Sequence, residues 1–174
     1  MRNEKTRKIV IAALFAALVY VATMIIKIPT PTNGYINLGD CIVLLAGFFL
    51  GPIWGGVAAG IGSCLADLIS GYMVYAPATL VIKALVAISA YAVFRAMGKS
   101  FFGSIIGGII GETVMVLGYF AFEWAMLMAG GSAPGAASIA AAAGIPMNLI
   151  QGAVGIVVSC ALYFGIFKRL GKEF

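Results

Sequence analysis

The sequence predicts an all-α integral membrane protein, a bundle of six transmembrane helices in a single domain with both termini in the cytoplasm. Its 174 residues are 63% hydrophobic and only 10% charged, with a mean hydropathy of +1.09. Six acidic and eleven basic residues cannot cover the surface of a soluble domain of this size. Since a spanning helix takes about 20 apolar residues, the chain has room for six spans and little else.

The first three apolar segments are 8–27, 38–50 and 53–70. The first follows a basic stretch and lacks a convincing small-x-small cleavage site before Pro29, so we interpret it as a retained span rather than a signal peptide. A Gly-Pro pair at 51 and 52 separates the second from the third. The two could instead form one long kinked helix, because a proline is tolerated inside a membrane helix.

The last three apolar segments are 77–97, 101–128 and 143–168. A Gly-Lys-Ser turn at 98–100 separates the first two. The small-residue stretch 130–144 precedes the last, and its proline and glycines predict a loop, although its alanines could form a short helix.

Charge favours a hairpin at 51 and 52 over one long helix. With the hairpin and a cytoplasmic N-terminus, all eleven basic residues except Lys27 and Lys83 fall on the cytoplasmic side. One long helix would place Arg95, Lys99 and the C-terminal basic cluster outside, against the positive-inside bias. The net charge of +5 therefore indicates membrane topology, and we expect no nucleic-acid partner.

Several classes of chemistry are excluded by what the sequence lacks. It has no histidine, no clustered metal ligands and no dinucleotide fingerprint, so we expect no metal, no cofactor and no enzymatic activity. The Gly-Lys-Ser turn resembles the end of a phosphate-binding loop, but Val93 stands where that motif needs its first glycine. Energy for any transport must come from an ion gradient or from a partner.

Three charged residues are expected at membrane depth, where a charge costs at least about 2.5–3.5 kcal/mol. Asp40 begins the second predicted helix, Asp67 lies near the outer end of the third, and Lys83 lies two turns into the fourth. Asp40 could simply cap its helix. Asp67 and Lys83 could form a structural ion pair between neighbouring helices, or one of them could face a cavity and bind solute.

The fifth predicted helix carries a polar stripe. Glu112, Tyr119 and Glu123 fall within about 40° of one another at helical periodicity. On the sixth, Asn148 and Gln151 form an i,i+3 pair of amides that can give directional hydrogen bonds to a heterocycle. Hydrogen bonding between helices is the alternative for this group, and structural pairing or protonation is the alternative for the deeper Glu112.

Aromatic side chains gather at the predicted outer ends of the helices. An interfacial belt explains them without any ligand, but a flat aromatic substrate would also stack against such rings. They are Tyr35, Tyr72, Tyr75, Tyr119 and Trp124.

The first predicted helix carries two overlapping small-xxx-small pairs near its cytoplasmic side. They are formed by Ala12, Ala13, Ala16 and Ala17. Such residues allow close approach of helix backbones, either within the chain or against another membrane subunit.

Three motifs resemble those of a known transporter family. They are GYINLGD at 34–40, GSCLADLISGY at 62–72 and APATLVIK at 76–83. Together they are similar to the substrate-binding S components of the energy-coupling factor (ECF) vitamin importers of bacteria. The branch they resemble is the one related to riboflavin S components that includes hydroxymethylpyrimidine and pyridoxine-type binders.

This resemblance implies a six-helix, multi-pass protein of the bacterial cell membrane that captures a vitamin near the outer face, under a gating loop at 28–38. It implies docking through the alanine face of the first helix onto a membrane T component carried by two ATP-hydrolysing subunits. It also implies toppling in the bilayer to release the substrate inside.

The resulting hypothesis is a vitamin-binding subunit whose best substrate is hydroxymethylpyrimidine, then pyridoxine or riboflavin. The acidic stripe favours an aminopyrimidine, since one carboxylate can accept from its amino group and from a protonated ring nitrogen. The predicted substrate-binding residues are Asn37, Asp40, Asp67, Tyr75, Lys83, Tyr119, Glu123, Asn148 and Gln151.

Two rival hypotheses remain open. The first is a proton-coupled secondary carrier in which Asp67 or Glu112 titrates. The second is a small membrane enzyme or assembly scaffold, which the lack of any catalytic constellation disfavours.

Overall fold

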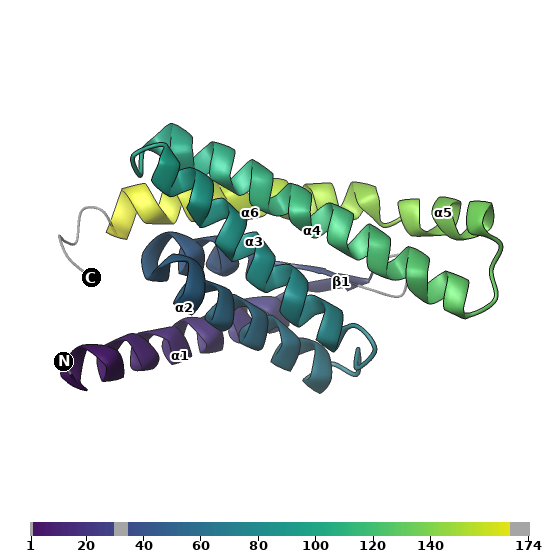
Figure 1. Cartoon of the computed structure of the whole chain (residues 1–174), viewed down its shortest axis with the longest axis horizontal. Helices are drawn as coiled ribbons and strands as arrows, with labels where there is room; N and C mark the ends of the chain where they lie inside the picture. Colours follow the sequence, from purple (N-terminus) through teal and green to yellow (C-terminus); the bar gives the residue numbers. More distant parts are fainter. Residues whose placement is uncertain (1, 30–34, 168–174) are drawn as a thin grey trace.

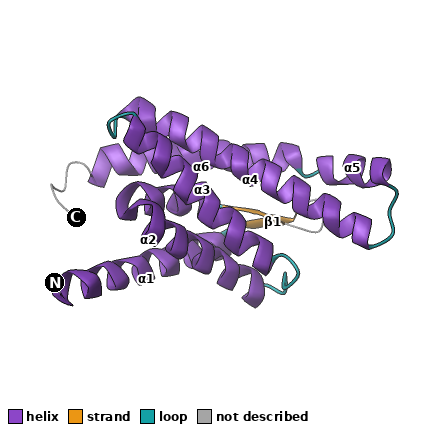
Figure 2. Cartoon of the chain, viewed as in Figure 1, coloured by secondary structure: helices purple, strands orange, loops and turns teal. Residues whose placement is uncertain are grey.

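The computed structural model describes residues 2–29 and 35–167, and these form a helical bundle with one short hairpin (Figures 1 and 2). Within the described ranges, five helical stretches are long and apolar enough to cross a membrane. In chain order the elements are α1 (Arg2–Ile25), β1 (Lys27–Pro29), β2 (Tyr35–Asn37), α2 (Gly39–Ile69), α3 (Ala76–Ala96), α4 (Phe101–Ala129), α5 (Pro134–Ala142), α6 (Ile145–Leu162) and a terminal π-helical segment, Tyr163–Phe167.

Helix α2 reverses direction at Gly51. This residue has φ 79° and ψ −172°, a left-handed backbone that favours glycine. A Cβ placed on Gly55 would lie 2.5 Å from the carbonyl oxygen of Ala46, whereas nine residues of a straight helix span about 13.5 Å. The two limbs, 39–50 and 52–69, therefore fold back on each other, and the alternative of one long kinked helix is wrong. The predicted all-helical membrane fold is confirmed, with five stretches long enough to span in the described residues instead of six.

The contacts of α3 also follow this reversal. Gly47 of the first limb packs on Ala87, one turn further along α3 than the contact between Asp40 and Lys83. On the second limb, Gly60 packs on Leu80. The first limb has only 12 residues and is about 18 Å long, too short to cross the hydrocarbon core by itself. Its first residues therefore begin inside the bundle.

The two ends of the bundle differ in charge. Arg7, Lys8 and Lys99 border one hollow together with Gly51, so the start of α1, the turn in α2 and the α3–α4 turn lie at one end. The β1–β2 hairpin, in which Lys27 pairs with Asn37, lies away from that end (Figure 1). The cytoplasmic location of the basic end stays a prediction, and the C-terminal basic cluster lies outside the described residues.

The core lies where α2, α3 and α4 meet. Leu44, Phe48, Val86, Phe94 and Met115 are buried there in one cluster. Glycines let the helices approach closely, as at Gly107, where a Cβ would lie 2.5 Å from the carbonyl oxygen of Ala90. Large apolar side chains such as Ile53, Leu117 and Val157 are exposed on the outside of the bundle, as expected for surfaces that contact lipid.

The segment before the last helix is more helical than predicted. The stretch 130–144 was expected mainly as a loop, but it contains α5, because its run of alanines favours a helix and Pro134 suits the first turn. A break near Gly144 then separates α5 from α6.

Candidate ligand-binding site

A small polar cavity lies among the bundle helices and the β1–β2 hairpin. Its volume is about 30 Å³, room for about two water molecules. Side chains from α1, β2, α2, α3, α4 and α6 line it, together with two tyrosines of the α2–α3 turn. They are Thr23, Tyr35, Asn37, Ser63, Asp67, Tyr72, Tyr75, Thr79, Lys83, Tyr119, Glu123, Asn148 and Gln151.

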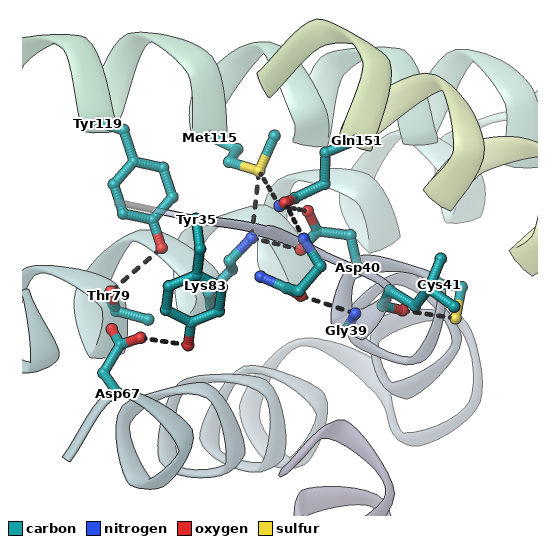
Figure 3. Close-up of polar contacts among 12 residues, drawn as sticks. Tyr35, Gly39, Asp40, Cys41, Asp67, Thr79, Lys83, Met115, Tyr119 and Gln151 are labelled. Carbon is teal, nitrogen blue, oxygen red and sulfur yellow. Dashed lines mark hydrogen bonds and ion pairs between the residues drawn. The ribbon is translucent and has the colours of Figure 1, made fainter. Parts of the chain in front are cut away.

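A buried ion pair borders the cavity. Lys83 pairs with Asp40 Oδ1, and Gln151 Nε2 donates to Asp40 Oδ2 at 2.5 Å (Figure 3). Lys83 also donates to Met115 Sδ at 3.1 Å. The predicted alternative pair of Lys83 with Asp67 is wrong, because the short first limb of α2 begins inside the bundle and brings Asp40 to the depth of Lys83. Asp40 thus ties α2 to α3 and α6 through its side chain.

The hairpin is held on α6 through the same glutamine. The backbone N–H of Asn37 donates to Gln151 Oε1 at 2.6 Å, and Asn37 Oδ1 accepts from the N–H of Gly39 at 2.7 Å. A Cβ on Gly39 would clash with Thr23 Oγ1 and lie 2.7 Å from Asn37 Oδ1, so a larger residue here would displace both side chains. Of the predicted gate at 28–38, residues 30–34 lie outside the described residues.

Tyrosines donate to the carboxylates of the cavity. Tyr35 donates to Asp67 Oδ1 at 2.6 Å and Tyr75 donates to Glu123 Oε1 at 3.4 Å. Burial raises the pKa of both phenols, and the neighbouring carboxylates raise it further. Both tyrosines therefore remain protonated donors at neutral pH.

The sequence prediction of the site and the cavity largely coincide. All the predicted binding residues line the cavity except Asp40, which lies behind Lys83. Their role in binding stays a prediction. Sequence reasoning missed Thr23, Ser63 and Thr79, whose small hydroxyl groups leave no clear signal in apolar helices. It considered Tyr35 and Tyr72 only as aromatic residues, and proximity in the fold is what assigns them to the cavity.

The four alanines of α1 divide between two surroundings. Ala12 is buried against Ala46 and Ala58 of α2, and the backbone of Ala16 touches Gly62. Ala13 and Ala17 are exposed. All four border an apolar groove of about 470 Å³ between α1 and α2, with Tyr20, Trp54, Val57, Ala58, Ile61, Leu65 and Ile9 as its other lining residues.

A membrane bundle of helices around a polar cavity, with a hairpin beside it, is the arrangement of a class, the solute-binding membrane proteins. The family can be stated as well. The chain belongs to the ECF-type riboflavin transporter S component family, whose model matches residues 3–168. It is therefore a substrate-binding subunit of a vitamin transporter and a multi-pass membrane protein, and its family is one of transporter components rather than enzymes.

One solved S component supports this assignment, and a second solved structure and a curated relative are also similar to this chain. The S component of a bacterial ECF transporter is 26% identical and covers 97% of this chain and 99% of its own, with a TM-score of 0.77. The biotin S component of an ECF-type ABC transporter shares the fold, at 18% identity and a TM-score of 0.64 over 100% of this chain and 96% of its own. A protein of Pyrococcus woesei, described only as uncharacterized and in the gap 3′ region, is 36% identical over 88% of this chain and 97% of its own length.

Proposed function

We propose that this chain captures a small ring-shaped vitamin or vitamin precursor in the polar cavity and delivers it to an ATP-driven energising module. The observation that carries the proposal is the cavity itself, in which hydroxyl, amide and carboxylate groups from six separate elements converge. Such convergence of polar groups is typical of small-molecule sites. Our preferred substrate is hydroxymethylpyrimidine, followed by pyridoxine and riboflavin.

The size and chemistry of the cavity support this order. At about 30 Å³ the cavity must widen to admit any ring, and a single six-membered ring requires the smallest displacement. Tyr35 and Tyr72 lie with ring centroids 4.7 Å apart, so a flat ring can stack beside them. Asp67 and Glu123 offer acceptors for amino or hydroxyl groups, and Asn148 offers an amide.

The energising partners in this proposal are an ECF T component and two ATPase subunits in a bacterial cell membrane, with both termini of this chain in the cytoplasm. The apolar groove between α1 and α2 supports the docking site, because Ala13 and Ala17 expose small side chains there. Small residues let a partner helix approach closely in lipid. The absence of a nucleotide motif from the sequence fits a subunit whose partners hydrolyse ATP.

The binding step is tested by native mass spectrometry of the detergent-purified chain, expressed alone. We expect one vitamin molecule per chain, and titration calorimetry with the three candidates should then rank them. If nothing co-purifies and none of the candidates binds at micromolar concentration, the proposed function is overturned.

The docking step is tested with Ala17→Trp, which fills the groove, and with Val157→Trp as a control on exposed surface of α6. We expect Ala17→Trp to abolish uptake in cells that contain the partners while binding of the vitamin by the purified chain is retained. The control variant should keep both. Uptake that persists in cells without the ATPases would instead support the proton-coupled carrier.

A further inference from the structure

Acidic groups outnumber basic groups inside the bundle. Asp40, Asp67, Glu112 and Glu123 are all at most 5% exposed, and Lys83 is the one cationic residue buried with them among the described residues. Lys83 pairs with Asp40, so Asp67 and Glu112 have no ion-pair partner among the described residues. Unpaired charge in a membrane interior is costly, so the excess of acidic groups requires bound protons or a bound cation.

The two lysines near the cavity act on Asp67 only at longer range. Lys83 is paired with Asp40 and directs a further hydrogen bond to Met115 Sδ. Lys27, the cation nearest to the hairpin side of the cavity, donates to Ser70 Oγ at 2.6 Å and lies 5.6 Å from the centroid of the Tyr35 ring. Neither lysine forms an ion pair with Asp67 in the described structure.

One carboxylate oxygen of Asp67 has spare acceptor capacity at the cavity. Tyr35 donates to Oδ1, whereas Oδ2 is fully buried and meets no described donor at good hydrogen-bond geometry. The hydroxyl of Thr79 lies near this carboxyl and interacts with it only weakly, since it is shared with Tyr119. Asp67 lines the cavity, on the same side as the hydroxyl groups of Tyr35 and Thr79 (Figure 3). A carboxylate oxygen in this position is matched by an N–H donor that carries positive charge, which forms shorter and stronger hydrogen bonds than a neutral donor.

The aromatic lining favours the same type of ligand. Tyr35, Tyr72, Tyr75 and Tyr119 all line the cavity, and the ring centroids of Tyr72 and Tyr75 are 6.4 Å apart. The faces of tyrosine rings attract cations as well as flat rings. The carboxylate of Asp67 and the tyrosine rings thus both favour a positively charged ligand.

We infer that this site selects a small ring that carries a positive charge, either on an ammonium group or on a protonated amino-substituted ring nitrogen, over neutral or anionic rings of the same size. The inference rests on the proposed function, because it concerns the ligand of the same cavity. It separates this chain from a site built for the neutral ring system of riboflavin.

A matched pair of ligands tests it. Pyridoxamine and pyridoxine differ in one position, an aminomethyl group that is charged at neutral pH against a hydroxymethyl group. The aminopyrimidine 4-amino-5-hydroxymethyl-2-methylpyrimidine and its 4-hydroxy analogue form a second pair. By titration calorimetry of the full chain in detergent, we expect the amino member of each pair to bind at least about tenfold more tightly, the size of one charge-assisted hydrogen bond.

The variant Asp67→Asn should reduce this preference to below about threefold, because the amide offers its ligand no negative charge. Glu112→Gln makes the same change at a buried carboxyl that does not line the cavity and should keep most of the preference. The thermal unfolding midpoint of each variant shows whether it is folded. If a variant fails to fold, the inference is tested by the affinities of the two ligand pairs for the unaltered chain.

The outcomes separate the two proposals. Equal or tighter binding of the hydroxyl members, or of riboflavin, overturns the charge selection and leaves the binding function intact. An undiminished preference in folded Asp67→Asn also overturns the assignment to Asp67. Failure of every ligand to bind overturns the proposed function, and the inference falls with it.

Discussion

Removing the carboxylate of the buried ion pair should destabilise the whole bundle. In Asp40→Asn, Lys83 loses its counterion and Gln151 Nε2 loses a charged acceptor, and the two paired side chains are only 1% and 3% exposed. Breaking one partner of a buried pair costs about 3–5 kcal/mol, because a charge is left uncompensated. For a chain of this length each kcal/mol shifts the unfolding midpoint by about 2–4 °C, so we expect a decrease of about 6–20 °C.

The double variant Asp40→Asn with Lys83→Met separates the pair from the individual side chains. Because it removes both charges, its loss of stability should be much smaller than the sum of the two single losses. The measurement is thermal unfolding in one detergent, followed by circular dichroism. Lys8→Met, at an exposed lysine, serves as the control and should change the midpoint little. Additive losses in the double variant would refute the claim that the two groups act as a pair.

Two further predictions concern the turn in α2 and the hairpin. Gly55→Ala places a Cβ 2.5 Å from the backbone of the opposite limb and should lower the free energy of unfolding by about 1–3 kcal/mol, measured by thermal unfolding. Gly135→Ala, which has open space for a Cβ, should be neutral or stabilising. Equal effects of the two variants would contradict the folded-back limb. Tyr35→Phe removes the hydrogen bond to Asp67, so ligand affinity should fall about tenfold in calorimetry. The pKa of Tyr35 is raised above its ordinary value near 10, so its contribution to stability is fully present below pH 10 and is lost at higher pH. Between pH 9 and 11, Tyr35→Phe should therefore lose less stability than the unaltered chain. Identical pH profiles of the two proteins would contradict this role.

The fold was largely predictable because membrane helices are recognisable from their apolar composition. Charge distribution alone chose the hairpin at 51 and 52 over one long helix, and the left-handed backbone of Gly51 explains why a glycine occupies the turn. The sequence did not predict the depth of Asp40 relative to Lys83 within the bundle. The first limb of α2 is short, and this length, rather than any motif, brings Asp40 beside Lys83.

The site was predictable where helical periodicity applied. Of the predicted stripe of Glu112, Tyr119 and Glu123, the last two line the cavity, because residues four apart share one face of a helix, whereas Glu112 does not line it. The alternative that paired Lys83 with Asp67 was wrong, since pairing between helices depends on their relative depth, which periodicity within one helix does not report. The alanines of α1 show the same limit, because spacing identified the small face but not its division between α2 and the open groove.

Gln151 connects the hairpin to the buried charges, and this connection links ligand access to stability. Its Oε1 accepts from the backbone of Asn37 in β2, while its Nε2 donates to Asp40, which in turn pairs with Lys83. Displacing β2 from α6 breaks the bond from Asn37 and leaves an amide oxygen without its donor inside the bundle, at a cost of about 1–3 kcal/mol. That cost is small enough for a ligand to offset, since a single charge-assisted hydrogen bond contributes a similar amount. The hydrogen bonds of Tyr35 to Asp67 and of Lys27 to Ser70 also hold the hairpin, so displacing it from α6 alone costs less than releasing it from the whole bundle.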